Sequence, residues 1–113
     1  PFANMDQETQ QKIQELQMIE QGLQQIMKHK NMLSMEANEA DLVVSEVEKT
    51  DDEVFRIVGN QVLIKSTKEG VLAETNKRKE MISKKLEEVS AQEKELSEKM
   101  DSIRDEVMKS IQG

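Results

Sequence analysis

Few side chains in this chain of 113 residues could do catalytic or metal chemistry. His29 is the only histidine, cysteine is absent, and no glycine-rich loop occurs that could cradle a phosphate. Catalytic triads, zinc sites and nucleotide pockets each need at least one of these features. The 23 Asp and Glu residues recur at the spacing of a solvated helix surface rather than as a paired acid and base. We therefore expect no catalytic residue, no bound metal, no cofactor and no enzyme activity.

The overall charge limits the partners. A net charge of −7 would repel nucleic acid and anionic membranes alike. The one basic run, Lys77-Arg78-Lys79, is typical of a solvated helix face. No apolar run approaches the roughly 20 residues that span a bilayer, and no charged-then-apolar leader opens the chain. Together with the absence of cysteine, this indicates a soluble, cytoplasmic protein.

Two long stretches carry the heptad pattern of coiled-coil helices. Only 35% of the residues are hydrophobic and only Phe2 and Phe55 are aromatic, which is too little for a compact globular core. In steps of three and four, the first predicted seam comprises Phe2, Met5, Thr9, Lys12, Leu16, Ile19, Leu23, Ile26, Lys30, Leu33, Ala37, Ala40, Val44 and Val47. The second comprises Leu72, Thr75, Lys79, Ile82, Leu86, Val89, Glu93, Leu96, Met100, Ile103, Val107 and Ser110. Most positions are apolar, so each helix is predicted to pack along one stripe.

The starts of both helices show the spacing of a capping box, in which one side chain caps a free N–H and another reaches back. The candidate pairs are Asn4 with Gln7 and Ser66 with Glu69. We predict a single domain over residues 1–113, with helices over about residues 5–49 and 67–110. The connection is short beside helices of about 65 Å, at 1.5 Å per residue. An antiparallel two-helix coiled coil is therefore expected.

The antiparallel pairing also predicts a register. It places Leu33 opposite Leu86 and brings Lys30 within one turn of Glu93. An ion pair between these charges would help to fix the register, although an exposed pair is often worth under about 1 kcal/mol. Parallel self-dimerisation is the alternative, and it would stretch the connection.

The stretch VFRIVGNQVLIK, about residues 54–65, predicts a β-hairpin around Gly59-Asn60. A two-residue turn would pair Ile57 with Val62 and Phe55 with Ile64. One face would then be wholly apolar, consisting of Phe55, Ile57, Val62 and Ile64, and Leu63 would lie on the mixed face.

A single hairpin is marginal in water, and its open strand edges invite pairing with other chains. Apolar residues of the flanking helices also spread around the helix circumference, in Leu42-Val43-Val44 and Val71-Leu72. We therefore expect the hairpin to be an assembly element. The predicted assembly residues are Phe55, Ile57, Val62, Leu63 and Ile64.

This arrangement resembles a prefoldin subunit of the beta class. The resemblance rests on two heptad helices that flank the single hairpin, followed by STKEGVLAETNKRKEMISKKLEEV, and is most detailed over about residues 50–90. It implies a hexamer of two alpha and four beta subunits, whose hairpins join into intersubunit β-barrels from which coiled coils project. It further implies an ATP-independent chaperone, or holdase, whose coiled-coil tips hold unfolded client proteins and pass them to a cytosolic chaperonin.

The tips can also be approached from the residues. Antiparallel folding would gather apolar side chains at the free end, namely Phe2, Met5, Met108 and Ile111. Flexible, polarisable methionines suit the binding of non-native chains. The residues alone fit frayed ends as well, and the resemblance favours client binding. The inner faces of the helices are the alternative client site, and a scaffold or tether that docks one fixed partner through the hairpin is the alternative function.

Overall fold

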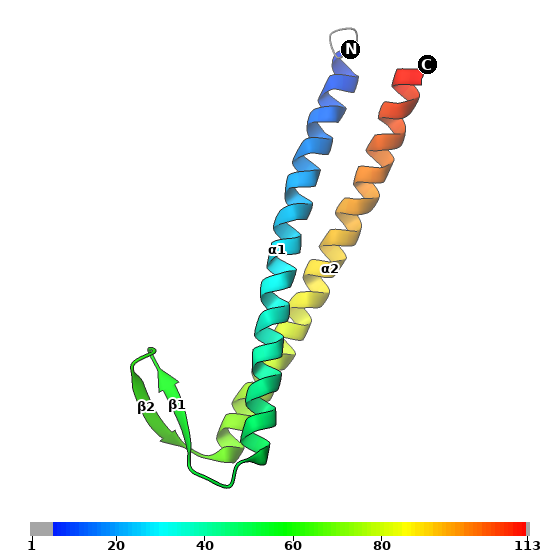
Figure 1. Cartoon of the computed structure of the whole chain (residues 1–113). Helices are drawn as coiled ribbons and strands as arrows, with labels where there is room; N and C mark the ends of the chain where they lie inside the picture. The colour runs from blue at the N-terminus through cyan, green and yellow to red at the C-terminus, as the bar shows by residue number, and fades with distance from the viewer. Residues whose placement is uncertain (1–5, 113) are drawn as a thin grey trace. The chain divides into compact units, whose positions relative to one another are not determined.

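The computed structural model describes residues 6–112 as two long helices and one hairpin (Figure 1). The order is α1 (Gln7–Lys49), β1 (Val54–Val58), β2 (Val62–Ser66) and α2 (Lys68–Gln112). The two strands form an antiparallel two-stranded sheet. The predicted fold class, mostly helical with one central hairpin, is confirmed. Over residues 6–112, no helix has a stretch apolar enough to cross a membrane.

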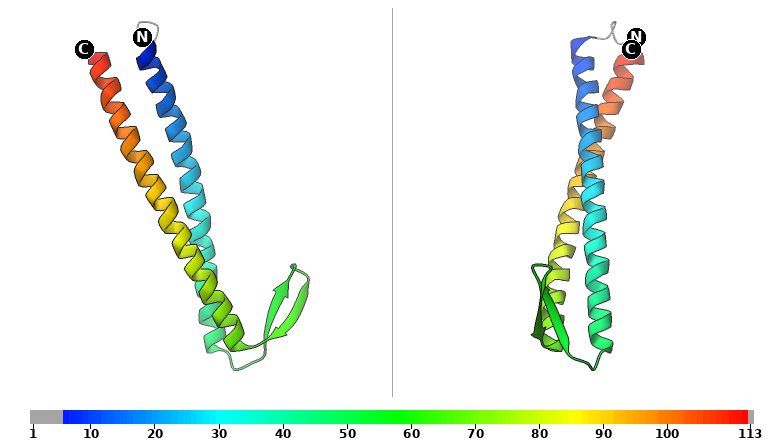
Figure 2. Two further views of the ribbon diagram at one scale, coloured as in Figure 1. Left: turned by 180° about the vertical axis from the view of Figure 1, so that it is seen from behind. Right: turned by 60° about the vertical axis from the view of Figure 1, so that its left-hand side comes forward.

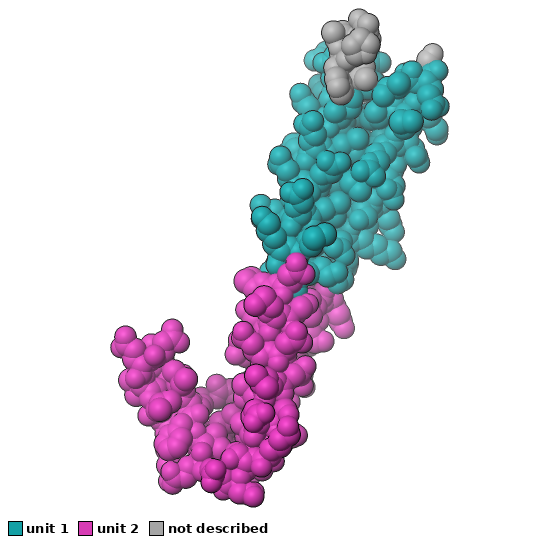
Figure 3. All heavy atoms as spheres, viewed as in Figure 1, with its two compact units in different colours: residues 1–30, 88–113 teal, residues 31–87 magenta. Residues whose placement is uncertain are grey.

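The chain divides into two compact units (Figure 3). Unit 1 comprises residues 1–30 and 88–113, and unit 2 comprises residues 31–87. In each unit a stretch of α1 lies beside a stretch of α2, as two further views show (Figure 2). Unit 2 also contains the hairpin.

The predicted seams are the packing stripes of both helices. Every predicted position from Thr9 to Val47 in α1, and from Leu72 to Val107 in α2, is buried or half-buried. In unit 1 the buried side chains of Ile19, Ile103 and Val107 form one cluster. In unit 2 the buried apolar residues are Leu33, Ala40, Val71 and Ile82. Burial along one stripe per helix is what a heptad pattern requires, because a and d positions recur on one face.

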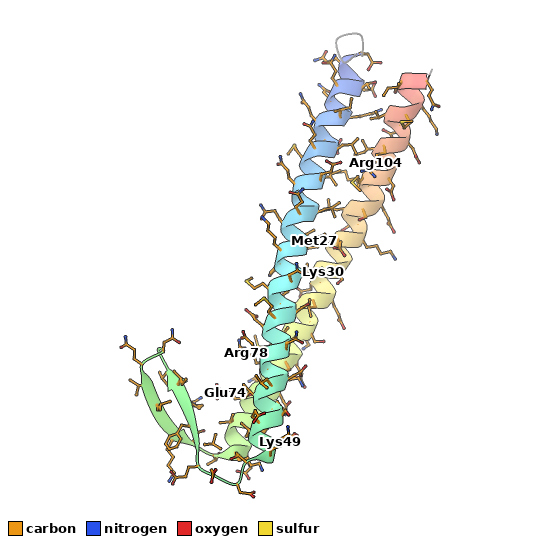
Figure 4. All side chains as sticks on the ribbon, viewed as in Figure 1. Met27, Lys30, Lys49, Glu74, Arg78 and Arg104 are labelled. Carbon is orange, nitrogen blue, oxygen red and sulfur yellow. The ribbon has the colours of Figure 1, made fainter. Side chains whose placement is uncertain are left out.

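Ion pairs between α1 and α2 lie in or beside the seams. The predicted pair of Lys30 with Glu93 is present, with 3.0 Å between Nζ and Oε1 (Figure 4 labels Lys30). The others are Lys12 with Glu106, Glu15 with Lys99, Glu20 with Arg104, and Asp41 with Lys79. Each pair joins a carboxylate to a cation of the other helix. The pairs agree with an antiparallel register close to the predicted one.

Both helix starts differ from the predicted caps. The Oδ1 atom of Asp6 accepts a hydrogen bond from the backbone N–H of Thr9 at 2.7 Å, so Asp6 caps α1. The Oγ1 atom of Thr67 accepts one from the N–H of Gly70 at 3.0 Å, so Thr67 caps α2. The prediction of Ser66 was wrong by one residue, because Ser66 still pairs in the β-ladder. Asn4, the other predicted cap, lies outside the described residues.

The predicted pairing of the hairpin was also wrong by one residue. The turn lies at Gly59 and Asn60, which both have left-handed φ angles, of 64° and 65°. The Gln61 N–H donates to the Val58 carbonyl at 3.4 Å, yet the ladder pairs Val58 with Val62 and leaves Gln61 in the loop. Every partner on β2 is therefore shifted by one, and such a shift moves a side chain to the opposite face.

Candidate functional site

The hairpin surface is the first candidate, defined by the five predicted assembly residues Phe55, Ile57, Val62, Leu63 and Ile64. All five are exposed, from 45% for Ile64 to 67% for Ile57. Exposed apolar residues that are contiguous on a small element mark an interaction site.

The corrected register distributes these residues over both faces. Ile57 lies directly opposite Leu63, and Phe55 lies opposite Lys65, so these four share one face. Val62 and Ile64 lie on the other face, where Arg56 is the partner of Ile64. The prediction of one wholly apolar face that joins Phe55 and Ile57 to Val62 and Ile64 is therefore wrong. Each face instead combines apolar side chains with one cation.

An ion pair gives the two faces different surroundings. The guanidinium of Arg56 pairs with the carboxylate of Glu74 on α2 (Figure 4 labels Glu74). The face that carries Arg56 is thus directed toward α2. The opposite face, with the pair Ile57 and Leu63 at its centre, is directed away from α2, because successive side chains of a strand alternate between faces.

The strand edges are open in the part of the chain that the structure describes. The sheet has the order β1-β2, so each strand has a hydrogen-bonded neighbour on one side only. Open edges present unpaired N–H and C=O groups to any further strand. The hairpin therefore offers both main-chain and apolar contacts to another strand.

Lys68 ties the start of α2 to the end of α1. Its Nζ atom donates to the carbonyl oxygens of Glu48 at 3.0 Å and Thr50 at 3.3 Å. These carbonyls lie at the C-terminal end of α1, where a cation satisfies orphan acceptors and interacts favourably with the helix dipole. The contact joins the two ends of the segment that carries the hairpin, and no local sequence pattern predicts it because its partners are 20 and 18 residues apart.

The helix-end surface is the second candidate, defined by the predicted tip residues Phe2, Met5, Met108 and Ile111. Met108 is 52% exposed and Ile111 is 54% exposed, and both lie near the C-terminal end of α2. Phe2 and Met5 lie outside the described residues. The structure thus places two of the four residues, and both carry uncovered apolar side chains.

Seam residues of α1 and α2 that adjoin this surface are buried. Val107 is 7% exposed and packs in the unit 1 cluster with Ile19 and Ile103. Thr9, near the start of α1, is 4% exposed. The seam is therefore covered up to Val107, and the apolar side chains that follow are uncovered.

Charged groups hold the two helices together near this surface. The Nζ atom of Lys12 lies 3.2 Å from Glu106 and 3.4 Å from Glu8. The hydrogen bond to Glu106 raises the pKa of Lys12 above its ordinary value. Hydrogen bonds from Thr9 lower the pKa of the Asp6 carboxyl. Both charged states are thus favoured in the folded chain.

Residues 6–112 contain no cluster of three or more His, Asp or Glu side chains that could hold a metal ion. His29 is half-buried on α1. What the two surfaces offer is exposed apolar contact area.

Exposed apolar residues also occur outside both surfaces. In unit 2 they include Met32, Met35 and Leu42 on α1 and Met81 on α2. None of these four belongs to a predicted seam. Leu42 belongs to the apolar stretch Leu42-Val43-Val44 that the sequence already singled out, and exclusion from the seams is the sequence signal that could have found the three methionines.

Comparison with known proteins places the chain in a family. A family model described as prefoldin subunit matches residues 10–113. The prefoldin subunit beta of Pyrobaculum arsenaticum is 35% identical over 91 residues, which is 79% of this chain and 73% of that protein. The one from Methanospirillum hungatei is 30% identical over 99% of this chain and 94% of its own. The crystal structure of the prefoldin beta subunit from Thermococcus strain KS-1 superposes with a TM-score of 0.90 at 26% identity and covers 97% of both chains. The chain therefore belongs to the prefoldin family, in its beta class.

Proposed function

We propose that this prefoldin chaperone subunit acts as an ATP-independent holdase in the cytoplasm, and that its assembly passes unfolded proteins to a chaperonin. Membership of the prefoldin family makes the chain a chaperone subunit that assembles with other prefoldin subunits. The stoichiometry that we propose is two alpha-class subunits with four copies of this chain.

The hairpin surface supports the assembly role. Its apolar side chains are exposed on both faces, and each strand has an open edge. Burial of an Ile or Leu side chain is worth about 1.5–3 kcal/mol, so several hairpins that bury these residues together would gain enough to hold subunits. A barrel formed by hairpins of several subunits would also remove the open edges.

One observation carries the holdase role. Met108 and Ile111 are exposed immediately after the buried Val107, near the C-terminal end of α2. We include Phe2 and Met5 in the same client site. Any single site of this size binds weakly, and several such sites on one assembly would bind a client by avidity. Weak multiple contacts also suit release of the client without nucleotide hydrolysis.

The test uses the assembled protein with Met108 and Ile111 both changed to Ser. We expect its mass to stay that of the full assembly, while its ability to suppress aggregation of a chemically unfolded client falls several-fold. The matched control changes Met18 and Met27 to Ser, which removes similarly exposed methionines of unit 1 (Figure 4 labels Met27).

Equal protection by the helix-end variant and the control would contradict the proposal and favour the inner helix faces as the client site. Binding of one folded protein, with no protection of unfolded ones, would support the scaffold alternative.

A further inference from the structure

Unit 2 presents two exposed helix faces of opposite charge, both outside the seams. The α1 outer face consists of Glu39, Leu42, Glu46 and Lys49. The α2 outer face consists of Glu74, Arg78, Met81 and Lys85. All eight residues are exposed, and the central ones, Leu42 and Met81, are 61% and 66% exposed.

The spacing of the charges on one face mirrors that on the other to within one residue. On the α1 outer face, Glu39 lies three residues before Leu42, Glu46 lies four residues after it, and Lys49 lies seven residues after it. On the α2 outer face, Lys85 lies four residues after Met81, Arg78 lies three residues before it, and Glu74 lies seven residues before it. Spacings of three, four and seven keep each set on one helix face. When the two helices run antiparallel with Leu42 opposite Met81, Lys49 falls opposite Glu74. Glu46 and Glu39 fall within one residue of the positions opposite Arg78 and Lys85.

Most of these charges lack an ion-pair partner within residues 6–112. Over residues 6–112, only Glu74 of the eight residues takes part in an ion pair, with Arg56 of the hairpin. The cations Arg78, Lys85 and Lys49 and the carboxylates of Glu39 and Glu46 have no ion-pair partner among these described residues. Figure 4 labels Lys49, Glu74 and Arg78.

The α2 outer face also borders a hollow in unit 2 of about 300 Å³. Leu33 and Ile82, both 6% exposed, provide apolar walls. Its lining is completed by Glu36, Arg78, Met81 and Lys85. An apolar side chain that approaches Met81, flanked by carboxylates, would meet apolar walls and a rim on which Arg78 and Lys85 outnumber Glu36.

We propose that the α1 outer face of one copy of this chain docks antiparallel on the α2 outer face of a second copy. Leu42 would contact Met81, Glu46 would pair with Arg78, and Glu39 would pair with Lys85. Lys49 would pair with one carboxylate oxygen of Glu74, while the other oxygen keeps its pairing with Arg56. This inference rests on the proposed hairpin assembly, because hairpins that join at one place bring neighbouring chains together with α1 of one antiparallel to α2 of the next.

The contact joins two different faces, so it is heterologous. A heterologous contact can repeat from copy to copy and closes into a ring when the rotation allows. Complementary charges mainly set which faces meet and in which direction. The outer faces would thereby determine the order of subunits, whereas the hairpins supply most of the burial.

Cross-linking tests the contact directly, because the chain has no natural cysteine. Chains with Leu42→Cys and chains with Met81→Cys are mixed, assembled with an alpha-class prefoldin subunit and oxidised. We expect a disulfide-linked dimer of the two variants. The control replaces Met81→Cys by Met18→Cys, which is 72% exposed and lies in unit 1. A yield no higher than that of the control would overturn the proposal.

Charge reversal provides a second test. The α1 variant is Glu39→Lys with Glu46→Lys, and the α2 variant is Arg78→Glu with Lys85→Glu. Each alone should weaken association between copies on the order of tenfold, since two exposed pairs become repulsive. An equimolar mixture should recover wild-type association, because each reversed face then meets a complementary one. A mixture as weak as the separate variants would contradict the proposal.

The hairpin variant Ile57→Asp with Leu63→Asp separates this inference from the proposed function. If it disperses the subunits while the cysteine pair fails to cross-link in the wild-type background, the hairpin role stands and the outer-face contact is wrong. If it leaves the assembly intact while the cross-link forms, the hairpin role is wrong and the contact stands. A hairpin variant that leaves the assembly intact, together with a cysteine pair that fails to cross-link, would refute both.

Discussion

At the scale of single residues, the helical glycines differ in what an added methyl group would meet. In α1, a Cβ at Gly22 would lie 3.7 Å from Cδ1 of Leu96, which is an ordinary contact distance. At Gly70, a Cβ would lie 2.8 Å from Oγ1 of Thr67, the cap of α2. The first position can accept a methyl group and the second cannot without disturbing the cap.

We therefore expect Gly22→Ala to raise the free energy of unfolding by about 1 kcal/mol, the usual difference in helix propensity. Gly70→Ala is the matched substitution and should gain less or destabilise, because it displaces the capping hydroxyl. Urea unfolding of both variants measures the difference. A larger gain at Gly70 than at Gly22 would show that the local packing is not as described.

The cap of α1 should depend on pH. Thr9 lowers the pKa of Asp6 in the folded chain. A lowered pKa means that the stabilisation is present above the unfolded value, about 3.9 for a free Asp, and is lost as the pH falls through the lower folded value. We expect the amide signal of Thr9 to shift in an acid titration followed by NMR. Asp6→Asn keeps an acceptor oxygen without the titration, so a persistent shift in that variant would assign the effect to another group.

At the scale of elements, the observed hairpin register places Phe55 and Ile57 on the face opposite to Val62 and Ile64, whereas the predicted register had put all four on one face. The face with Ile57 and Leu63 is directed away from α2, whereas Arg56, on the other face, pairs with Glu74. We expect Ile57→Asp with Leu63→Asp to release subunits, because these side chains are free to contact another hairpin. The matched variant, Val58→Asp with Val62→Asp, should release fewer. Mass measurement of each assembly decides between the faces, and the opposite order would mean that the Arg56 face is the buried one.

The seam could be predicted because it rests on a period repeated over about forty residues in each helix. A single misfit such as Lys30 does not disturb such a pattern, and its pairing with Glu93 could even be anticipated. The hairpin faces depend instead on whether Gln61 belongs to the loop or to the ladder. One residue decides that, and the pair Gly59-Asn60 permits a turn in either case.

The caps show the same limitation. Ser66 and Thr67 are adjacent and can both cap, so the choice depends on where β2 stops pairing. The contacts of Lys68 with the end of α1, and of Arg56 with Glu74, join residues 18 or 20 positions apart. No local pattern in the sequence predicts these two contacts. For the candidate surfaces, the sequence predicted which apolar residues take part. Whether those side chains are exposed could be read only from the folded structure.

At the scale of the whole molecule, the chain carries two apolar surfaces that its own helices leave uncovered. The hairpin surface belongs to unit 2, and the described part of the helix-end surface belongs to unit 1. We assign assembly to the first and client binding to the second. The two functions should therefore be separable by substitutions in different units, which neither a single shared surface nor a one-partner tether would allow.

The most direct test of this division places a photo-reactive side chain at position 108 or position 57 of the assembled protein, in the presence of an unfolded client. From Met108 we predict cross-links mainly to the client, and from Ile57 cross-links mainly to another prefoldin subunit. Position 18, where Met18 is 72% exposed in unit 1, is the control for incidental contact. If position 18 captures as much client as position 108, or if position 57 captures client instead of subunits, the division of roles is wrong.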